Sequence, residues 1–174
     1  YLRFLPAANW NGSAPTLTVA LIDSSTTVTT NATVDVSTRG GTTAYSSSTV
    51  TLSNTVNAVN DAPVASGSAT LTAIDEDTAN PSGATVSSLF SSNFSDSTDT
   101  VSGGSSANTL AGIAITSYTR DATKGEWQYS TNGSSWTTIG SSISAASSSL
   151  TFKSTDYLRF LPAANWNGSA PTLT

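Results

Sequence analysis

The chain has 174 residues and a net charge of −5, from 6 basic and 11 acidic side chains. This acidic balance argues against nucleic acid or an anionic membrane as a partner, and no apolar run is long enough for membrane insertion. The sequence has no Cys and no His, which excludes disulfides, Ser-His or Cys-His catalytic dyads and ordinary zinc sites.

Alternating apolar residues predict β-strands from the beginning of the chain. Leu17, Val19 and Leu21 share one face of a strand that Asp23 ends. In the first part of the chain, the predicted strands cover residues 2–5, 15–23, 33–37 and 48–59.

The segment VNDAPVA, residues 59–65, is the candidate domain boundary. Pro63 lacks an N–H and biases Ala62 toward an extended backbone, so a short, stiff connector is expected. We therefore predict that residues 1–58 are the C-terminal part of one repeat and residues 59–64 the connector. Residues 65–174 are then the N-terminal part of the next repeat.

The second part of the chain is also predicted to be β structure, with at most one short helix. Val86, Leu89, Phe90 and Phe94 follow the helical spacing i, i+3, i+4 and i+8, which places the helix near residues 86–94. Asn132-Gly133 favours a tight hairpin turn. The remaining predicted strands cover residues 69–74, 110–118, the hairpin 126–139, and 150–153. Short strands separated by turns indicate an all-β, antiparallel sandwich.

An internal repeat organises the whole chain. The segment YLRFLPAANWNGSAPTLT fills residues 1–18 and returns unchanged as residues 157–174, an offset of 156 residues. A perfect repeat of this length indicates a tandem array, with neighbouring repeats of the same chain as partners. Because the chain begins and ends at the same point of the repeat, we also expect its half-domains to complement each other head to tail between molecules.

The acidic side chains suggest calcium. From residue 40 to residue 119 there are six acids and no Lys or Arg. Calcium binds six to eight hard oxygen ligands, from carboxylates, amides, backbone carbonyls and water. The alternative is that these acids are solubilising loop residues or helix caps. The candidate metal ligands are Asp23, Asn60, Asp61, Asp75, Glu76, Asp77, Asp96 and Asp99.

Aromatic and acidic residues of the chain also suggest two other functions. Trp127, Tyr129 and Trp136 could form a sugar-binding platform, which would make the chain a duplicated carbohydrate-binding module; the alternative is cross-strand packing. A carboxylate pair could serve a glycosidase, but adjacent loop acids without an enclosing apolar pocket are weak candidates. We therefore expect that the chain is not an enzyme.

Four segments in order carry a family resemblance: VNDAPVA, IDEDT, GEWQYSTNGSSWTTI and LRFLPAANWNGSAPTLTVALID. Together they resemble the cadherin-like or immunoglobulin-like extender repeats of giant RTX-type surface adhesins, across essentially the whole chain. By position, Asn60 and Asp61 match the connector of these repeats, and Glu76 and Asp77 match the acidic pair after the first strand. Asp96 matches the acid after an aromatic residue, but SDSTD replaces the adjacent DxD of many relatives.

The resemblance implies a function in cell adhesion and biofilms. Such repeats form a rod that holds a distal binding region away from the cell, and calcium near the junctions stiffens the rod. It also implies type I secretion by a Gram-negative bacterium and an extracellular position at the cell surface. The sequence therefore predicts a non-catalytic, calcium-rigidified spacer.

Overall fold

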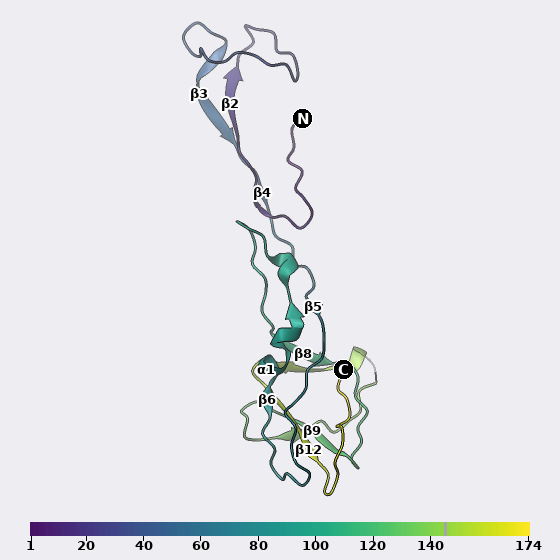
Figure 1. Ribbon diagram of the computed structural model, residues 1–174. Coiled ribbons are helices and arrows are strands. Elements are labelled where there is room, and N and C mark those ends of the chain that lie inside the picture. Colours follow the sequence, from purple (N-terminus) through teal and green to yellow (C-terminus); the bar gives the residue numbers. More distant parts are fainter. Residues whose placement is uncertain (145) are drawn as a thin grey trace. The chain divides into compact units, whose positions relative to one another are not determined.

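The computed structural model describes residues 1–144 and 146–174 (Figure 1). The chain forms two compact units. Unit 1 contains Tyr1–Asp61 and Ser97–Ala107, and unit 2 contains Ala62–Asp96 and Asn108–Thr174. The chain therefore passes from one unit to the other between Asp61 and Ala62, and a polar loop from the later sequence belongs to unit 1.

Unit 1 is built from four strands and one 3₁₀ turn, η2 (Ser97–Asp99). The strands are β1 (Gly12–Ser13), β2 (Leu17–Ile22), β3 (Tyr45–Leu52) and β4 (Thr55–Val56). β2 pairs with β3 and β1 pairs with β4, both antiparallel. Figure 1 shows β2 and β3 as the long pair of this unit. Val, Ile and Thr in β2, and Tyr, Val and Thr in β3, favour an extended backbone.

One face of the β2–β3 pair is apolar and open, and we call it the apolar face of unit 1. Its residues are Leu17, Val19, Leu21, Val50 and Leu52, with Leu17 paired to Leu52 and Val19 to Val50. Leu17, Leu21, Val50 and Leu52 each expose 51–56% of their surface. Among buried hydrophobic residues only Ala14 belongs to unit 1, all of whose residues are described. Unit 1 therefore lacks a hydrophobic core of its own. Isolated two-stranded pairs of this kind are at best marginally stable.

Unit 2 contains the hydrophobic core. A four-stranded antiparallel sheet has the order β10-β9-β12-β6, beside the pairs β11-β8 and β5-β7. The strands are β5 (Val64–Ala65), β6 (Ala84–Thr85), β7 (Phe94–Ser95), β8 (Gly112–Ile115), β9 (Gly125–Ser130), β10 (Thr137–Thr138), β11 (Leu150–Lys153) and β12 (Tyr157–Pro162). The core residues are Val86, Ile115, Tyr118, Ile139, Ile143, Phe152 and Leu158. The prediction of an all-β, antiparallel fold is confirmed.

The single short helix predicted near residues 86–94 is also confirmed. α1 (Val86–Phe90) continues into the 3₁₀ turn η1 (Ser91–Asn93), and a second short turn, η3, covers Ala146–Ser148. The hydroxyl of Thr85 accepts a hydrogen bond from the Ser88 amide at 3.0 Å, as an N-cap does. Val86 is fully buried and anchors the helix to the core.

Three predicted strands are absent from the described residues. Residues 2–5 and 33–37 in unit 1, and residues 69–74 in unit 2, form no strand. In the middle segment, Asp35 accepts a hydrogen bond from the Ser37 amide at 2.9 Å, which closes a turn instead. Alternation alone was insufficient at these positions, because a strand also needs a neighbouring edge to bond with.

The two identical copies of the repeat have different structures. In the second copy, β12 lies between β9 and β6. Leu158 is 2% exposed, whereas its counterpart Leu2 in the first copy is 83% exposed. In unit 1, no strand takes the part of β9 or β6, so residues 1–6 are left without a ladder. Tertiary neighbours therefore decide whether this sequence becomes a strand.

Tyr118 introduces a pH-dependent weakness into the core of unit 2. Its side chain is 1% exposed, and its hydroxyl has no hydrogen-bond partner among the residues that the structure describes. The Trp127 backbone is close enough to favour the ionised form weakly. Burial raises the pKa of Tyr118, and the negative charge of Glu126 raises it further. The pKa of Tyr118 is therefore higher in the folded than in the unfolded protein. The stability of the fold is unaffected below the ordinary tyrosine pKa, about 10, and is lost as pH rises from there through the folded-state pKa.

We predict that Tyr118→Phe stabilises the protein by about 1 kcal/mol at neutral pH, because a buried hydroxyl without a partner is removed. It should also lose less stability than the wild type above about pH 10. Urea denaturation of both proteins at pH 7 and pH 10.5 measures the two effects. A substitution that destabilises at both pH values would contradict the burial argument.

Candidate functional site

The predicted ligands Asp61 and Asp99 meet in unit 1. Asp99 ends η2 and is 7% exposed, and its Oδ1 accepts a hydrogen bond from the Asp61 amide at 2.9 Å. Asn60 Nδ2 donates to the Asp61 carbonyl oxygen at 2.8 Å. The end of the connector segment in unit 1 is therefore held by a carboxylate from the loop at residues 97–107.

The same loop is fastened by Asn11, a residue that our sequence interpretation did not select. Asn11 is 7% exposed, its Nδ2 donates to Ser105 Oγ at 2.8 Å, and its Oδ1 accepts from the Ser105 amide at 2.7 Å. Ser105 Oγ in turn donates to the Asp99 carbonyl oxygen at 2.5 Å. The repeated NWNG sequence was the available signal, but the partner lies 94 residues away.

Asp96 is the predicted ligand that is buried in unit 2. Its side chain is 6% exposed, and Oδ2 accepts a hydrogen bond from the Asn108 amide at 2.6 Å. The ion pairs of the described residues are Arg120–Glu126 and Lys124–Asp121, so no base pairs with Asp96 or Asp99. Burying a carboxylate without an opposite charge is costly, because the surrounding protein solvates it poorly.

Glu76 and Asp77 contact the second copy of the repeat. Asp77 adopts a left-handed backbone with φ of 63° in an exposed turn, and its Oδ1 accepts from the Asn165 amide at 2.7 Å. Glu76 Oε2 accepts from Asn167 Nδ2 at 3.2 Å. These acids therefore have a structural role, which is to hold the turn that follows β12.

Asp75 and Asp23 are both exposed at the surface. The Asp75 carbonyl accepts from Thr78 Oγ1 at 2.6 Å. Asp23 follows β2 and accepts from the Ser25 hydroxyl at 2.5 Å and the Ser25 amide at 2.8 Å. These two hydrogen bonds, the hydroxyl first, lower the pKa of Asp23.

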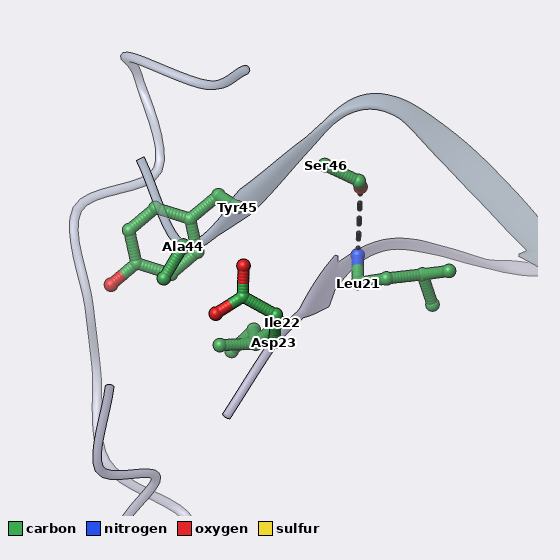
Figure 2. Close-up of a pocket in the computed structure, with 6 residues that line it drawn as sticks. All are labelled: Leu21, Ile22, Asp23, Ala44, Tyr45 and Ser46. Carbon is green, nitrogen blue, oxygen red and sulfur yellow. Dashed lines mark hydrogen bonds between the residues drawn. The ribbon is translucent and has the colours of Figure 1, made fainter. Parts of the chain in front are cut away.

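Figure 2 shows the open hollow beside Asp23, at the end of the β2–β3 pair. It is lined by Leu21, Ile22, Asp23, Ala44, Tyr45 and Ser46. Ser46 Oγ accepts from the Leu21 amide at 2.9 Å within it. The hollow contains one carboxylate and no other charged group, so by itself it provides few ligands for a cation.

The predicted ligands thus fall into several places. The described residues contain no cluster of three or more Asp, Glu, His or Cys side chains arranged to hold a metal ion. Calcium also accepts amide oxygens, backbone carbonyls and water. In unit 1 the Asp61 carbonyl oxygen, which accepts from Asn60, and Asn11 Oδ1, which accepts from Ser105, are oxygens on residues that are linked to Asp99 through hydrogen bonds. The chemistry of this oxygen-rich set fits calcium better than zinc, which prefers nitrogen and sulfur.

The aromatic residues considered for sugar binding are engaged in packing. Trp127 contacts the edge of Phe160 with ring centres 5.5 Å apart, and Tyr129 lies 5.0 Å from Phe152. Arg159 lies over the ring of Trp136 at 4.1 Å from its centre. A sugar platform needs exposed ring faces, and these contacts occupy faces or edges of the three rings.

None of the helices in the described part of the chain has the length and apolar character that a membrane span requires. No family model, curated protein or solved structure matches the chain.

Proposed function

We propose that this chain is a non-catalytic structural spacer from a calcium-rigidified tandem array in a bacterial cell-surface adhesin. The exact return of 18 residues at an offset of 156 residues supports an array. Identical copies suit a mechanical function, whereas an active site does not need to be repeated. The partners of each copy are then its neighbours in the same chain, and the position is extracellular.

The observation that carries the calcium proposal is the burial of two predicted ligands, one in each unit. Asp96 and Asp99 are 6% and 7% exposed, and each accepts a hydrogen bond from a backbone amide rather than from a cationic side chain. A divalent cation would supply the missing positive charge. Asp99 with Asp61 and Asn60 would hold an ion in unit 1, and Asp96 would contribute in unit 2.

Calcium binding to the native state should raise the melting temperature. At a free concentration 100 times the dissociation constant the gain is about 2.7 kcal/mol, which corresponds to roughly 5–10 °C for a domain of this size. Differential scanning calorimetry in calcium and in EDTA measures the shift. Magnesium should give a much smaller shift, because it retains its water and uses fewer protein carboxylates.

The variants Asp96→Asn and Asp99→Asn sharpen this test. In EDTA each substitution should leave the melting temperature unchanged or raise it. The buried, uncompensated charge is removed, while an oxygen that can accept the hydrogen bond from the backbone amide remains. In calcium each should be less stable than the wild type, so the sign reverses. Asp35→Asn is the matched control, since Asp35 is exposed and also accepts a hydrogen bond from a backbone amide. Equal melting temperatures in calcium and EDTA would refute the calcium proposal.

A further inference from the structure

β8 in unit 2 has an unpaired edge. Among the described residues, β8 (Gly112–Ile115) pairs only with β11, which covers one of its two edges. The Ser154 amide donates to the Ala111 carbonyl at 2.8 Å, so the odd-numbered residues direct their backbone groups toward β11. Backbone groups alternate along a strand, so Gly112 and Ala114 direct theirs to the other edge. An exposed edge of this kind is a template for another strand.

The last residues of the second copy, Leu173 and Thr174, lie along the continuation of this edge, just past the end of β8. Tyr118 bridges Leu173 in antiparallel fashion, and the Thr174 amide donates to the Ser117 carbonyl at 2.9 Å. The amides of Thr116 and Ser117 both donate to the Thr174 carbonyl, at 2.6 and 3.1 Å. Two successive residues opposite one are a β-bulge, and the next residue after Thr174 would therefore face Ile115.

The chain itself contains the continuation of this strand. Leu173-Thr174 repeats Leu17-Thr18, and in the first copy the sequence goes on as Val19–Asp23 within and just after β2. In the described part of the chain β2 pairs only with β3, so it also has a free edge there. The amides of Leu21 and Asp23 donate to the β3 side, to Ser46 Oγ and the Ala44 carbonyl. By alternation, Ala20 and Ile22 direct their backbone groups to the free edge.

We infer that the free edge of β8 binds the Val19–Asp23 strand of a second copy of this chain. The bulge fixes the register, with Val19 opposite Ile115, Ala20 opposite Ala114 and Leu21 opposite Ile113. Ala20 and Ala114 then both direct backbone groups toward each other and exchange hydrogen bonds.

The side chains agree with this register. Leu173, the counterpart of Leu17, packs against the core of unit 2, as does Ile113, while Ile115 is 2% exposed. Residues opposite each other in a sheet share a face. Val19 and Leu21 would therefore continue the row that Leu173 begins, and the apolar face of unit 1 would be covered.

The contact joins unit 1 of one molecule to unit 2 of the next, so it is heterologous and extends into a head-to-tail chain of molecules. It consists of backbone hydrogen bonds and apolar contacts and involves none of the candidate calcium ligands except Asp23, at the strand's end. The inference is therefore independent of calcium and goes beyond the proposed function.

Engineered cysteines test the register, because the chain has no Cys of its own. Opposed residues in an antiparallel pair have Cα atoms about 5.5 Å apart, within the range of a disulfide. Mixing an Ala20→Cys protein with an Ala114→Cys protein under mild oxidation in EDTA should give a cross-linked dimer. Val28→Cys in place of Ala20→Cys is the control, since Val28 is 64% exposed in unit 1 but lies outside the strand. A similar yield from both mixtures would overturn the register.

Sedimentation velocity over a concentration series in EDTA tests the association itself. The wild type should increase in mass with concentration, Leu21→Asp should remain monomeric, and Ile22→Asp should still associate, because only Leu21 faces the core. Both changes place one carboxylate on the same exposed strand, so they disturb unit 1 alike. A wild type that stays monomeric throughout, or variants that behave identically, would overturn the inference. If calcium had no effect on the melting temperature, the calcium proposal would fail, but the self-association measured here would be unchanged.

Discussion

Leu158→Ala should lower the free energy of unfolding by about 2–5 kcal/mol, and Leu2→Ala should change it by less than about 0.5 kcal/mol. Both positions lie in the same 18-residue sequence. Leu158 in β12 is 2% exposed and belongs to the core of unit 2, whereas Leu2 is 83% exposed. Removing the Leu158 side chain therefore costs the transfer free energy of its methyl groups and leaves a cavity, and neither cost applies to Leu2.

Urea denaturation followed by circular dichroism measures both variants, and each serves as the control for the other because the local sequence is identical. Equal losses of stability would show that the two copies share one environment in solution, contrary to the structure. A large loss for Leu2→Ala alone would show that the first copy, rather than the second, supplies the sheet strand.

Arg159→Met should lower the free energy of unfolding by about 3 kcal/mol, while Arg3→Met in the other copy should have little effect. The Arg159 side chain is 6% exposed. It donates to Gln128 Oε1 at 2.7 Å, to Asn80 Oδ1 at 2.6 Å and to the Pro81 carbonyl at 3.0 Å. These partners are neutral, and burial lowers the pKa of Arg159. Methionine retains much of the packing volume but leaves several acceptors unsatisfied.

The Trp136 ring provides a second readout for Arg159, because the guanidinium lies 4.1 Å from its centre. Arg159→Met should change the tryptophan fluorescence of the folded protein, and Arg159→Lys should restore charge without the planar fork of donors. We therefore expect the lysine variant to recover only part of the lost stability. Full recovery would show that charge alone, rather than the hydrogen-bond geometry, stabilises this position.

Local signals in the sequence predicted the elements that depend on local spacing. Val86, Leu89 and Phe90 placed the short helix, and the alternation of residues 150–153 predicted β11 with the observed bounds. The Asn132-Gly133 pair lies between β9 and β10, where Ser130 and Asn132 side chains accept hydrogen bonds from backbone amides. The connection is longer than the tight turn predicted, because Thr137 pairs with Tyr129. Turn chemistry and apolar period are carried by neighbouring residues, so one sequence is enough to reveal them.

Features that depend on distant partners were not predictable in the same way. Residues 1–6 and Tyr157–Pro162 have identical sequences, yet only the latter forms a strand, between β9 and β6. The contact of Asn11 with Ser105 joins residues 94 apart, and that of Asp61 with Asp99 joins residues 38 apart. Composition drew attention to the acids, but only tertiary structure separates buried Asp99 from exposed Asp75.

The corner after the repeated strand keeps its shape in both copies. Asn9 and Asn165 each have φ of 57°, and the rings of Phe4 and Trp10, like those of Phe160 and Trp166, meet edge to face at 5.6 and 5.7 Å. This geometry is present whether or not the preceding residues are in a sheet, so it is encoded by the segment itself. Such a corner can fold early, before long-range pairing, and act as a local nucleus. Every duplication of the segment then carries its own starting point for folding.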